Sequence, residues 1–312
     1  MNAENKIIRL LEERKEDGIL QSEIAKILNL SKSTVSEIIS KLEEDGIVVR
    51  KRVTSKSYRV WLSAYSPEPV EGFIRIGILR ASEYPKVVKA ARNAYIRVYE
   101  NSIELTRSLI YGYVDIAASP LITQAFFGVL MKNIEIFRIV AMNGSGVVFS
   151  NEKSEYFGSS EFSTMERNLR KYLDIRGLNA KIRYFKSAED MIKNLNELKG
   201  IAIWEPYLTL LNMDKDYFNN VIGDFICCTL AVNKNFLEIN REEFEEFLDK
   251  FDSAKVSRGD AERLSELIEF DSDVIAKSFS NYVFDVVQDE ITILKELEFL
   301  RFGGVDKILR FY

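Results

Sequence analysis

The sequence predicts an α/β protein with a small N-terminal domain, residues 1–64, and a larger domain, residues 73–312. Three observations predict this division. Residues 1–64 contain three helical patterns followed by two short strand patterns. Residues 65–72 contain two prolines and lack apolar periodicity, which is typical of a linker. From residue 73 onward, strands alternate with helices, which favours sheets that helices cover on both faces.

The first domain begins with three short helices. Apolar residues at helical spacing predict a first helix that Gly18 ends, and residues 21–28 form a second. Ser31 is a suitable N-cap for a third helix, which reaches Asp45 and stops at Gly46. We expect an apolar stripe of this helix to face the interior, namely Val35, Ile38, Ile39 and Leu42.

The opposite face of the third helix carries small polar side chains, which can approach base edges in a major groove of DNA. After Gly46, two strands around a polar turn form a hairpin, residues 47–50 and 58–61. From residue 50 to 59 this hairpin carries five bases and no acid, which suits phosphate contacts beside the groove. The candidate DNA-binding residues are Lys32, Ser33, Thr34, Ser36, Glu37, Ser40, Arg50, Lys51, Arg52, Lys56 and Arg59.

The string LQSEIAKILNLSKSTVSEIISKLEEDGIVVRKR resembles the winged helix-turn-helix of MarR-type and related archaeal regulators. This resemblance covers about one-fifth of the chain and implies binding to double-stranded DNA. Two alternatives are a winged helix that contacts only protein and a plain helical bundle. The plain bundle would leave the basic hairpin unexplained.

The body alternates between the two types of element. We expect strands at 73–79, 96–99, 114–118, 134–142, 181–185, 200–204 and 225–232, in a mainly parallel sheet. We expect helices at 83–94, 102–111, 121–131, 164–173 and 188–198, and a largely helical segment at 241–312.

Five segments of the body resemble the type II periplasmic-binding-protein fold, in particular the group of sulfonate, nitrate and thiamine-pyrimidine binding proteins. They are GFIRIGIL, NSIELTRSLIYGYVDIAASPLITQAFF, FSTMERNLRKYL, IAIWEPYLTLL and CCTLAVNKNFLE. The resemblance implies two lobes that close on a small molecule, with a crossover near residues 143–146 and a second lobe at roughly 145–222. It does not identify the ligand.

The carboxyl ends of strands and the N-termini of helices are where open α/β sheets bind ligands. Polar residues at these places are the candidate ligand-binding residues. They are Arg80, Ser82, Glu83, Ser119, Thr123, Gln124, Ser145, Ser160, Ser163, Thr164, Trp204, Glu205 and Tyr207. The alternatives are helix capping for the serines, a core position for Trp204, and an ion pair of Arg80 with a carboxylate such as Glu83.

Composition narrows the possible functions. The chain contains no histidine, which excludes imidazole bases, Ser-His-Asp triads and His-ligated zinc. Its two cysteines, Cys227 and Cys228, are adjacent, so neither a disulfide framework nor a CxxC metal motif is present. We expect these two side chains to lie on opposite faces of a strand, and we expect no cofactor and no metal site.

Charge and hydropathy favour a cytoplasmic protein that binds DNA. Residues 1–66 have a net charge of +2 and residues 67–312 have a net charge of −7, which gives −5 for the whole chain. No stretch approaches the about 18 apolar residues of a membrane span, and the charged segment 1–14 lacks the apolar core of a secretory signal. The abundance of Ile, Lys and Glu is typical of thermophile proteins.

Together these features predict a transcription regulator whose operator binding responds to a small-molecule effector. The alternatives are a cytosolic enzyme on the same fold and a ligand-independent architectural DNA binder. Regulators with winged helices usually bind as dimers, so we expect a homodimer. The apolar run Ile291, Leu294, Leu297 and Leu300 provides either its interface or a core helix of the first lobe.

Overall fold

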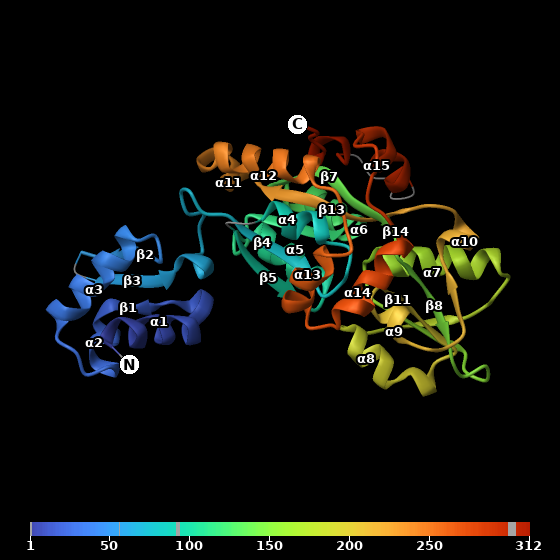
Figure 1. Ribbon diagram of the computed structural model, residues 1–312, viewed down its shortest axis with the longest axis horizontal. Coiled ribbons are helices and arrows are strands. Elements are labelled where there is room, and N and C mark those ends of the chain that lie inside the picture. The colour runs from blue at the N-terminus through green and yellow to red at the C-terminus, as the bar shows by residue number, and fades with distance from the viewer. Residues whose placement is uncertain (1, 56, 92–93, 299–303) are drawn as a thin grey trace.

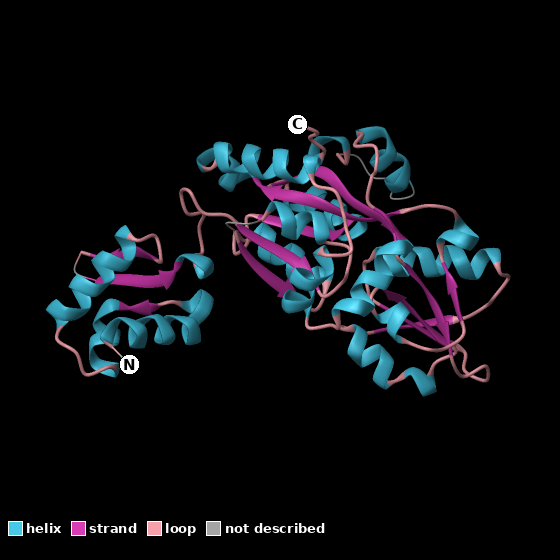
Figure 2. Ribbon diagram, in the orientation of Figure 1, coloured by secondary structure: helices cyan, strands magenta, loops and turns pink. Residues whose placement is uncertain are grey.

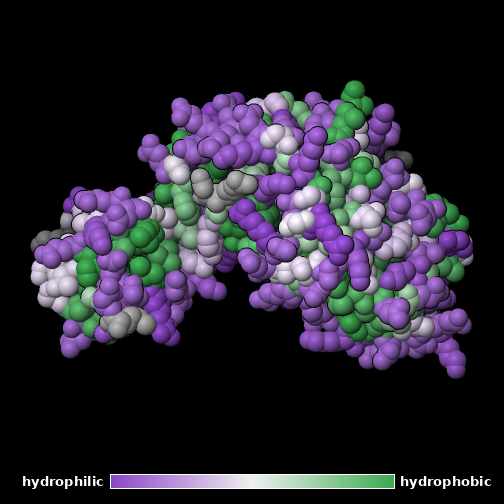
Figure 3. All heavy atoms as spheres, viewed as in Figure 1, coloured by the Kyte–Doolittle hydropathy of each residue, from purple (hydrophilic) through white to green (hydrophobic). Residues whose placement is uncertain are grey.

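The computed structural model describes residues 2–55, 57–91, 94–298 and 304–312. A small N-terminal domain, here called the head, is joined through a narrow neck to a two-lobed body (Figure 1). In Figure 3 the visible surface of both parts is mainly hydrophilic. Among the described residues, no helix is long and apolar enough to cross a membrane.

The head contains the predicted helices and hairpin. Its elements are α1 (Ala3–Arg14), β1 (Ile19–Leu20), α2 (Gln21–Ile27), α3 (Lys32–Glu44), β2 (Val48–Thr54) and β3 (Ser57–Leu62). The strands form an antiparallel sheet in the order β1-β3-β2, of which β1 is too short to be predicted from the sequence. Apolar side chains of all three helices and of the sheet form a hydrophobic core separate from that of the body.

Ser31 caps α3, as its position predicts. Its side-chain oxygen accepts a hydrogen bond from the backbone N–H of Thr34 at 3.0 Å. We expect Ser31→Ala to lower the unfolding free energy of the head by about 1 kcal/mol, because this N–H loses its partner. Urea denaturation followed by circular dichroism of the full chain measures the change. Ser40→Ala, on the same helix but away from the cap, is the matched control.

The first lobe contains a six-stranded sheet in the order β14-β7-β13-β6-β4-β5. Its strands are β4 (Arg75–Leu79), β5 (Tyr95–Tyr99), β6 (Ile116–Pro120), β7 (Ile134–Asn143), β13 (Ile226–Asn233) and β14 (Tyr282–Val283). Its helices are α4 (Pro85–Ala90), α5 (Ser102–Ile110), α6 (Leu121–Met131), α11 (Lys234–Ile239), α12 (Arg241–Ser253), α13 (Asp260–Ile268), α14 (Ser272–Ser278) and α15 (Glu290–Leu297).

The second lobe contains a five-stranded sheet in the order β10-β9-β11-β8-β12. Its strands are β8 (Ser145–Phe149), β9 (Tyr156–Ser159), β10 (Lys181–Tyr184), β11 (Gly200–Trp204) and β12 (Lys215–Tyr217). Its helices are α7 (Thr164–Ile175), α8 (Ala188–Lys193), α9 (Tyr207–Leu210) and α10 (Asn219–Ile222). Helices cover the sheets of both lobes (Figure 2).

The predicted α/β class and the two lobes are confirmed, but the sheets are mixed instead of mainly parallel. In the first lobe β4 pairs in parallel with β5 and β6, whereas β13 runs antiparallel to both β6 and β7. The reason is connectivity. The chain leaves the first lobe after β7 and returns from the second lobe as β13, so β13 enters the sheet from the opposite end.

Two adjacent chain segments connect the lobes, one at Asn143-Gly144 and the other at Gly223-Asp224. The Asn143 side chain links them, because its Nδ2 donates to Asp224 at 2.9 Å and its Oδ1 accepts from Phe225 N at 3.3 Å. Gly144 has φ 74°, and a Cβ there would lie 1.8 Å from the Tyr282 ring. Position 144 therefore requires glycine on both conformational and steric grounds.

The linker is anchored to the first lobe. Ser66 is fully buried, and its carbonyl oxygen accepts a hydrogen bond from the Arg75 guanidinium at the start of β4. The same guanidinium forms a fully buried ion pair with Asp115, at 2.6 and 2.9 Å. The backbone N–H of Gly72 donates to Asn240 at 2.7 Å. These bonds attach both ends of the linker to the first lobe.

The C-terminal apolar run is divided between the core and the surface. Leu297 is buried in the core of the body, whereas Ile291 is 62% exposed and Leu294 is 37% exposed. Leu300 lies outside the described residues. The core alternative therefore applies to Leu297, and the exposed pair is what remains for a dimer interface.

Candidate DNA-binding surface and interlobe cavity

The candidate residues of α3 lie together on its outward face. Lys32, Ser33 and Glu37 are exposed, while Thr34, Ser36 and Ser40 are half-buried. The hydroxyls of Ser33 and Thr34 each lie 2.8 Å from the Ser31 hydroxyl, so both share in the cap. The opposite face of the helix packs into the core of the head, as the apolar stripe predicts.

The described basic side chains of the β2–β3 hairpin have partners within the protein. Arg50 pairs with Glu43 at 2.7 Å, and Lys51 pairs with Glu68 of the linker. Arg52 donates to two carbonyls of the turn at 2.8 and 3.2 Å, and Arg59 donates to the Asp17 carbonyl at 2.7 Å. Lys56 lies outside the described residues. The contacts of Arg52 and Arg59 are exposed, and those of Arg50 and Lys51 are partly exposed. Contacts of this kind are weak, so a phosphate can replace them at little cost.

A small cavity lies between the two lobes, with a volume of about 40 Å³. The first lobe contributes Leu79, Ala81, Glu83, Glu100, Asn101, Ser102, Pro120, Cys227 and Cys228 to its wall, and the second lobe contributes Ser160, Ser163, Met165, Lys186 and Trp204. Because one water needs about 10–15 Å³ by such a measure, the cavity has room for an ion or a few waters. A larger ligand requires the lobes to move apart.

Four of the predicted ligand-binding residues line this cavity, namely Glu83, Ser160, Ser163 and Trp204. Trp204 and several other candidates hold the lobes together. Trp204 Nε1 donates to the Arg80 carbonyl at 3.1 Å, and Ser82 N donates to the Glu205 carbonyl at 3.1 Å. Two hydroxyls act in the same way, since Thr123 Oγ1 donates to Phe162 O at 2.7 Å and Thr164 Oγ1 donates to Cys227 O at 3.1 Å.

Arg80 and Tyr207 meet at one carboxylate of the second lobe. The Arg80 guanidinium lies 3.0 Å from Glu189, and the Tyr207 hydroxyl donates to the same carboxylate. Burial, together with this hydrogen bond, raises the pKa of Tyr207. Arg80 thus pairs across the lobes with Glu189 and not with Glu83, the partner considered in the sequence.

The remaining candidates, apart from Ser145, belong to internal polar networks. Ser119 bonds to the Thr106 hydroxyl at 3.1 Å, and Gln124 Nε2 donates to the Ala117 carbonyl at 2.9 Å. Glu205 accepts hydrogen bonds from Thr209 N, Tyr217 Oη and Asn281 Nδ2 at 2.7–3.0 Å. Burial raises its pKa, which these hydrogen bonds partly offset. The Ser145 hydroxyl is buried without a hydrogen-bond partner among the described residues.

Sequence reasoning missed several residues of the cavity wall. Glu100, Asn101 and Ser102 follow β5, and Lys186 follows β10. These residues follow the carboxyl ends of strands, where open α/β sheets bind ligands. The same rule, applied to every strand of the sequence, identifies them. Met165, inside the first turn of α7, carries no such signal.

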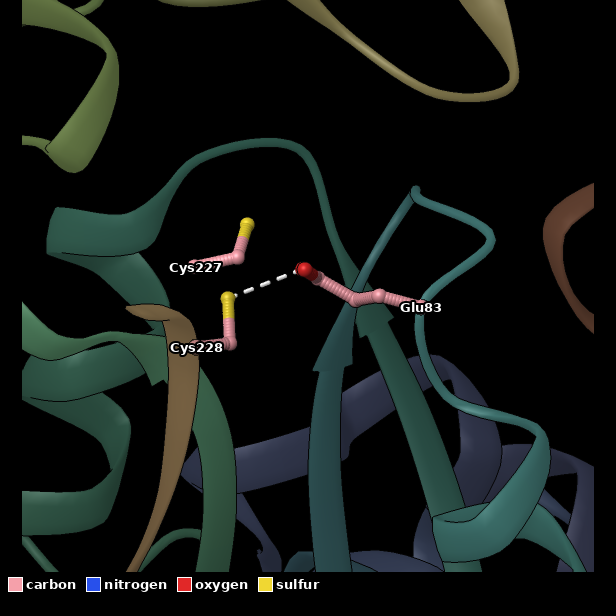
Figure 4. Close-up of side chains that lie close together, drawn as sticks. All are labelled: Glu83, Cys227 and Cys228. Carbon is pink, nitrogen blue, oxygen red and sulfur yellow. Dashed lines mark hydrogen bonds between the residues drawn. The ribbon is translucent and has the colours of Figure 1, made fainter. Parts of the chain in front are cut away.

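The prediction that Cys227 and Cys228 lie on opposite faces of a strand is wrong. Both are buried, and their sulfur atoms lie near the carboxylate of Glu83 (Figure 4). The pairing register of β13 with β7 shifts between Ile226 and Cys228, so the alternation of side chains is interrupted there. Burial raises the pKa of Cys228 and also that of Glu83.

Strand β5 connects the cavity wall with the head. Near its start, the Tyr95 hydroxyl donates to the Tyr65 hydroxyl at 3.1 Å, and Arg97 forms an ion pair with Glu16 of the head. The Arg97 guanidinium also lies 5.5 Å from the centre of the Tyr65 ring. The strand ends at Tyr99, and the next three residues line the cavity.

Comparisons with known proteins give a family match for the head and structural matches for the body. Residues 3–49 match the family described as winged helix-turn-helix DNA-binding. No curated protein matches the chain in sequence. Among solved structures, the ligand-binding component of an ABC-type import system from Staphylococcus aureus, with zinc bound, has a TM-score of 0.62 and 16% identity, over 77% of this chain and 96% of that chain.

Two further solved structures have the same fold. The alkanesulfonate-binding protein from Xanthomonas axonopodis pv. citri, bound to MOPS, has a TM-score of 0.61 and 14% identity, over 78% of this chain and 99% of that one. The periplasmic nitrate-binding protein from Synechocystis PCC 6803 has a TM-score of 0.61 and 13% identity, over 78% and 87%. The chain therefore joins a winged helix-turn-helix DNA-binding domain to a body with the periplasmic-binding-protein fold, which confirms both resemblances.

Proposed function

We propose that this protein is a cytoplasmic transcription regulator whose affinity for a double-stranded DNA operator changes when a small ligand binds between the lobes. The head supplies a helix with an exposed polar face and a basic hairpin, the two parts that a winged helix uses on DNA. The body supplies a cavity at the junction of two lobes. A homodimer with two-fold-related heads is the assembly that this function favours.

The observation that carries the proposal is the path through β5. Residues 100–102 line the cavity, and Arg97 of the adjoining strand contacts Glu16 of the head. A ligand that moves residues 100–102 therefore also moves β5, which contacts the head through Arg97. Signalling requires that the ligand favour one head arrangement over another, and such a path provides the required contact.

The proposal is tested in two stages. First, the full chain is used to select bound sequences from a pool of random duplexes, which yields a preferred operator. Second, metabolites and metal ions are screened for a rise in melting temperature, since a ligand at 100 times its Kd stabilises by about 2.7 kcal/mol. Addition of such a ligand is expected to change operator affinity by about 5–150-fold.

Removing the contact of β5 with the head is expected to uncouple the sites. In Arg97→Met with Glu16→Gln, a ligand should still raise the melting temperature, while its effect on operator affinity falls below about 2-fold. Fluorescence anisotropy of labelled operator measures the affinity. The matched control is Lys181→Met with Glu155→Gln, which removes an exposed ion pair of 2.9 Å in the second lobe. This control is expected to keep the full response.

Other results would contradict the proposal. Selection that enriches no sequence would favour architectural DNA binding, and turnover of a screened metabolite would favour an enzyme. A ligand that binds tightly without changing operator affinity would show that the body is not a sensor for this head.

A further inference from the structure

Three side chains with metal-binding chemistry meet at the cavity. The sulfur atoms of Cys227 and Cys228 and a carboxylate oxygen of Glu83 all lie within 4.8 Å of one another. Cys228 Sγ is 2.8 Å from Glu83 Oε1 (Figure 4). The ligand atoms of a tetrahedral zinc ion lie roughly 3.5–3.8 Å apart, given its usual bond lengths. Small side-chain movements therefore bring the three groups onto one ion.

The fold brings these residues together from distant parts of the chain. Glu83 lies in the loop between β4 and α4, whereas the two cysteines lie on β13. In a regular strand, adjacent side chains point to opposite faces. The register shift at Ile226–Cys228 instead leaves both thiols beside Glu83. Irregularities of this kind often serve to aim a side chain at a functional site.

The Glu83 carboxylate is buried and only partly satisfied by the protein. The exposed fraction of Glu83 is 3%, and its Oε2 has no hydrogen-bond partner among the described residues. A buried carboxylate normally requires hydrogen bonds or a cation, because leaving water costs it several kcal/mol.

We infer that Glu83, Cys227 and Cys228 bind one thiophilic divalent cation, with Zn²⁺ as the reference ion. Thiolates favour zinc over calcium and magnesium, which take oxygen ligands. Three protein ligands leave the fourth tetrahedral position open, as in zinc sites that bind a further molecule. All three side chains line a cavity of about 40 Å³, which has room for a water.

Charge is consistent with a divalent ion. Two thiolates and one carboxylate bring three negative charges, so the occupied site carries −1. Lys186 of the second lobe lines the same cavity and supplies a compensating positive charge. Met165 and Trp204 of the second lobe also line it, so the ion lies where the two lobes meet. That this ion is the effector rests on the proposed function, whereas its binding does not.

The chain offers a clean spectroscopic test, because it contains two cysteines and no histidine. The full-length, reduced, metal-free protein is titrated with Cd²⁺ and with Co²⁺. We expect a thiolate-to-cadmium charge-transfer band in the ultraviolet and tetrahedral cobalt bands in the visible, each saturating at one ion per chain. Zn²⁺ is expected to displace Co²⁺ and abolish its bands.

Variants assign the ligands. Cys227→Ser and Cys228→Ser are each expected to lower zinc affinity by more than about 100-fold, measured against a chromophoric chelator, since the loss of a metal ligand exceeds the 10–100-fold cost of an outer partner. Glu83→Gln should weaken binding and change the cobalt spectrum. Glu155→Gln is the matched control, because Glu155 is an exposed carboxylate of the second lobe that does not line the cavity.

Several outcomes would overturn the site. These are no cadmium band in the wild-type protein, a stoichiometry far from one, and zinc affinity that survives both cysteine substitutions. The wild-type titration decides the matter even if a variant does not fold. Operator affinity is measured separately with and without Zn²⁺. If zinc binds at this cluster but operator affinity stays the same, the metal site stands and its role as effector fails.

Discussion

Replacing Arg50, Lys51 and Arg52 by alanine is expected to weaken binding to a mixed-sequence duplex by roughly 10–100-fold at low salt and to flatten its salt dependence. Removal of one phosphate-binding base lowers the slope of log affinity against log salt by about 1, so the slope should fall by about 3. Bonds to phosphates carry no sequence information, so all duplexes should be affected alike. Fluorescence anisotropy over a series of salt concentrations measures both quantities.

The acidic residues that pair with the bases of this hairpin provide a control in which DNA affinity should rise instead of fall. Glu43 pairs with Arg50, and Glu68 pairs with Lys51. Substitution of both acids by glutamine should strengthen DNA binding, because the bases are then free of competing carboxylates and the surface has two fewer negative charges. A second control is alanine at exposed bases of the second lobe, Lys181, Arg183 and Lys193. If these reduce affinity as much as the hairpin variant, the hairpin is not the DNA-binding surface.

Substitutions on the outward face of α3 test the recognition of DNA sequence separately from the overall affinity for DNA. Ser33 and Ser36 lie on the outward face of the helix, away from the core. Their replacement should alter which sequences are preferred, whereas the hairpin variant should not. This contrast is the signature of a helix in the major groove with phosphate contacts beside it.

The head was predictable because its signals are local. Ser31 caps a helix whose apolar stripe repeats at helical spacing, and Gly46, with φ 70°, follows this helix before the hairpin begins. Each of these features depends on neighbours within a few residues. The exception is β1, whose two residues are a strand only because they pair with β3.

The body was predictable in its elements but less so in their arrangement. Helices such as α6 (Leu121–Met131) have their predicted bounds, whereas strand direction depends on the return of the chain as β13. No local sequence pattern indicates that the chain returns to the first lobe as β13. Three strands of the second lobe, β8, β9 and β12, were also missed. Of these, β12 lies at the edge of the sheet and pairs with β8 after a long separation in the sequence.

The prediction of site residues from the sequence has the same limit. Polarity at the ends of strands identified Glu83 and Trp204, which line the cavity, but it also selected residues that hold the lobes together, such as Thr123 and Glu205. A polar residue beyond a strand serves a ligand or another lobe equally well, and the sequence alone does not distinguish the two. The meeting of Glu83 with the cysteines depends on a bulge in β13, which has no reliable sequence signal.

A fully buried ion pair stabilises the body, and Asp115→Asn is expected to lower the unfolding free energy of the body by about 3–5 kcal/mol. Arg75 and Asp115 are both fully buried, with two hydrogen bonds between guanidinium and carboxylate at 2.6 and 2.9 Å. Substitution leaves the guanidinium charge buried and unpaired, which is the costly case. Differential scanning calorimetry of the full chain measures the shift, which should be roughly 10 °C for a domain of this size.

The effect should be confined to the body. The head has its own hydrophobic core, so its transition and its affinity for a mixed-sequence duplex should stay unchanged. Asp273→Asn is the matched control, since it breaks an ion pair with Arg258 whose side chains are 70% and 80% exposed, and should cost no more than about 1 kcal/mol. An Arg75→Met, Asp115→Leu variant should recover only part of the stability, because Arg75 also donates to the carbonyls of Ser66 and Gly112. A cost below about 1 kcal/mol for Asp115→Asn, or an equal shift in both transitions, would show that this pair does not hold the body and linker together.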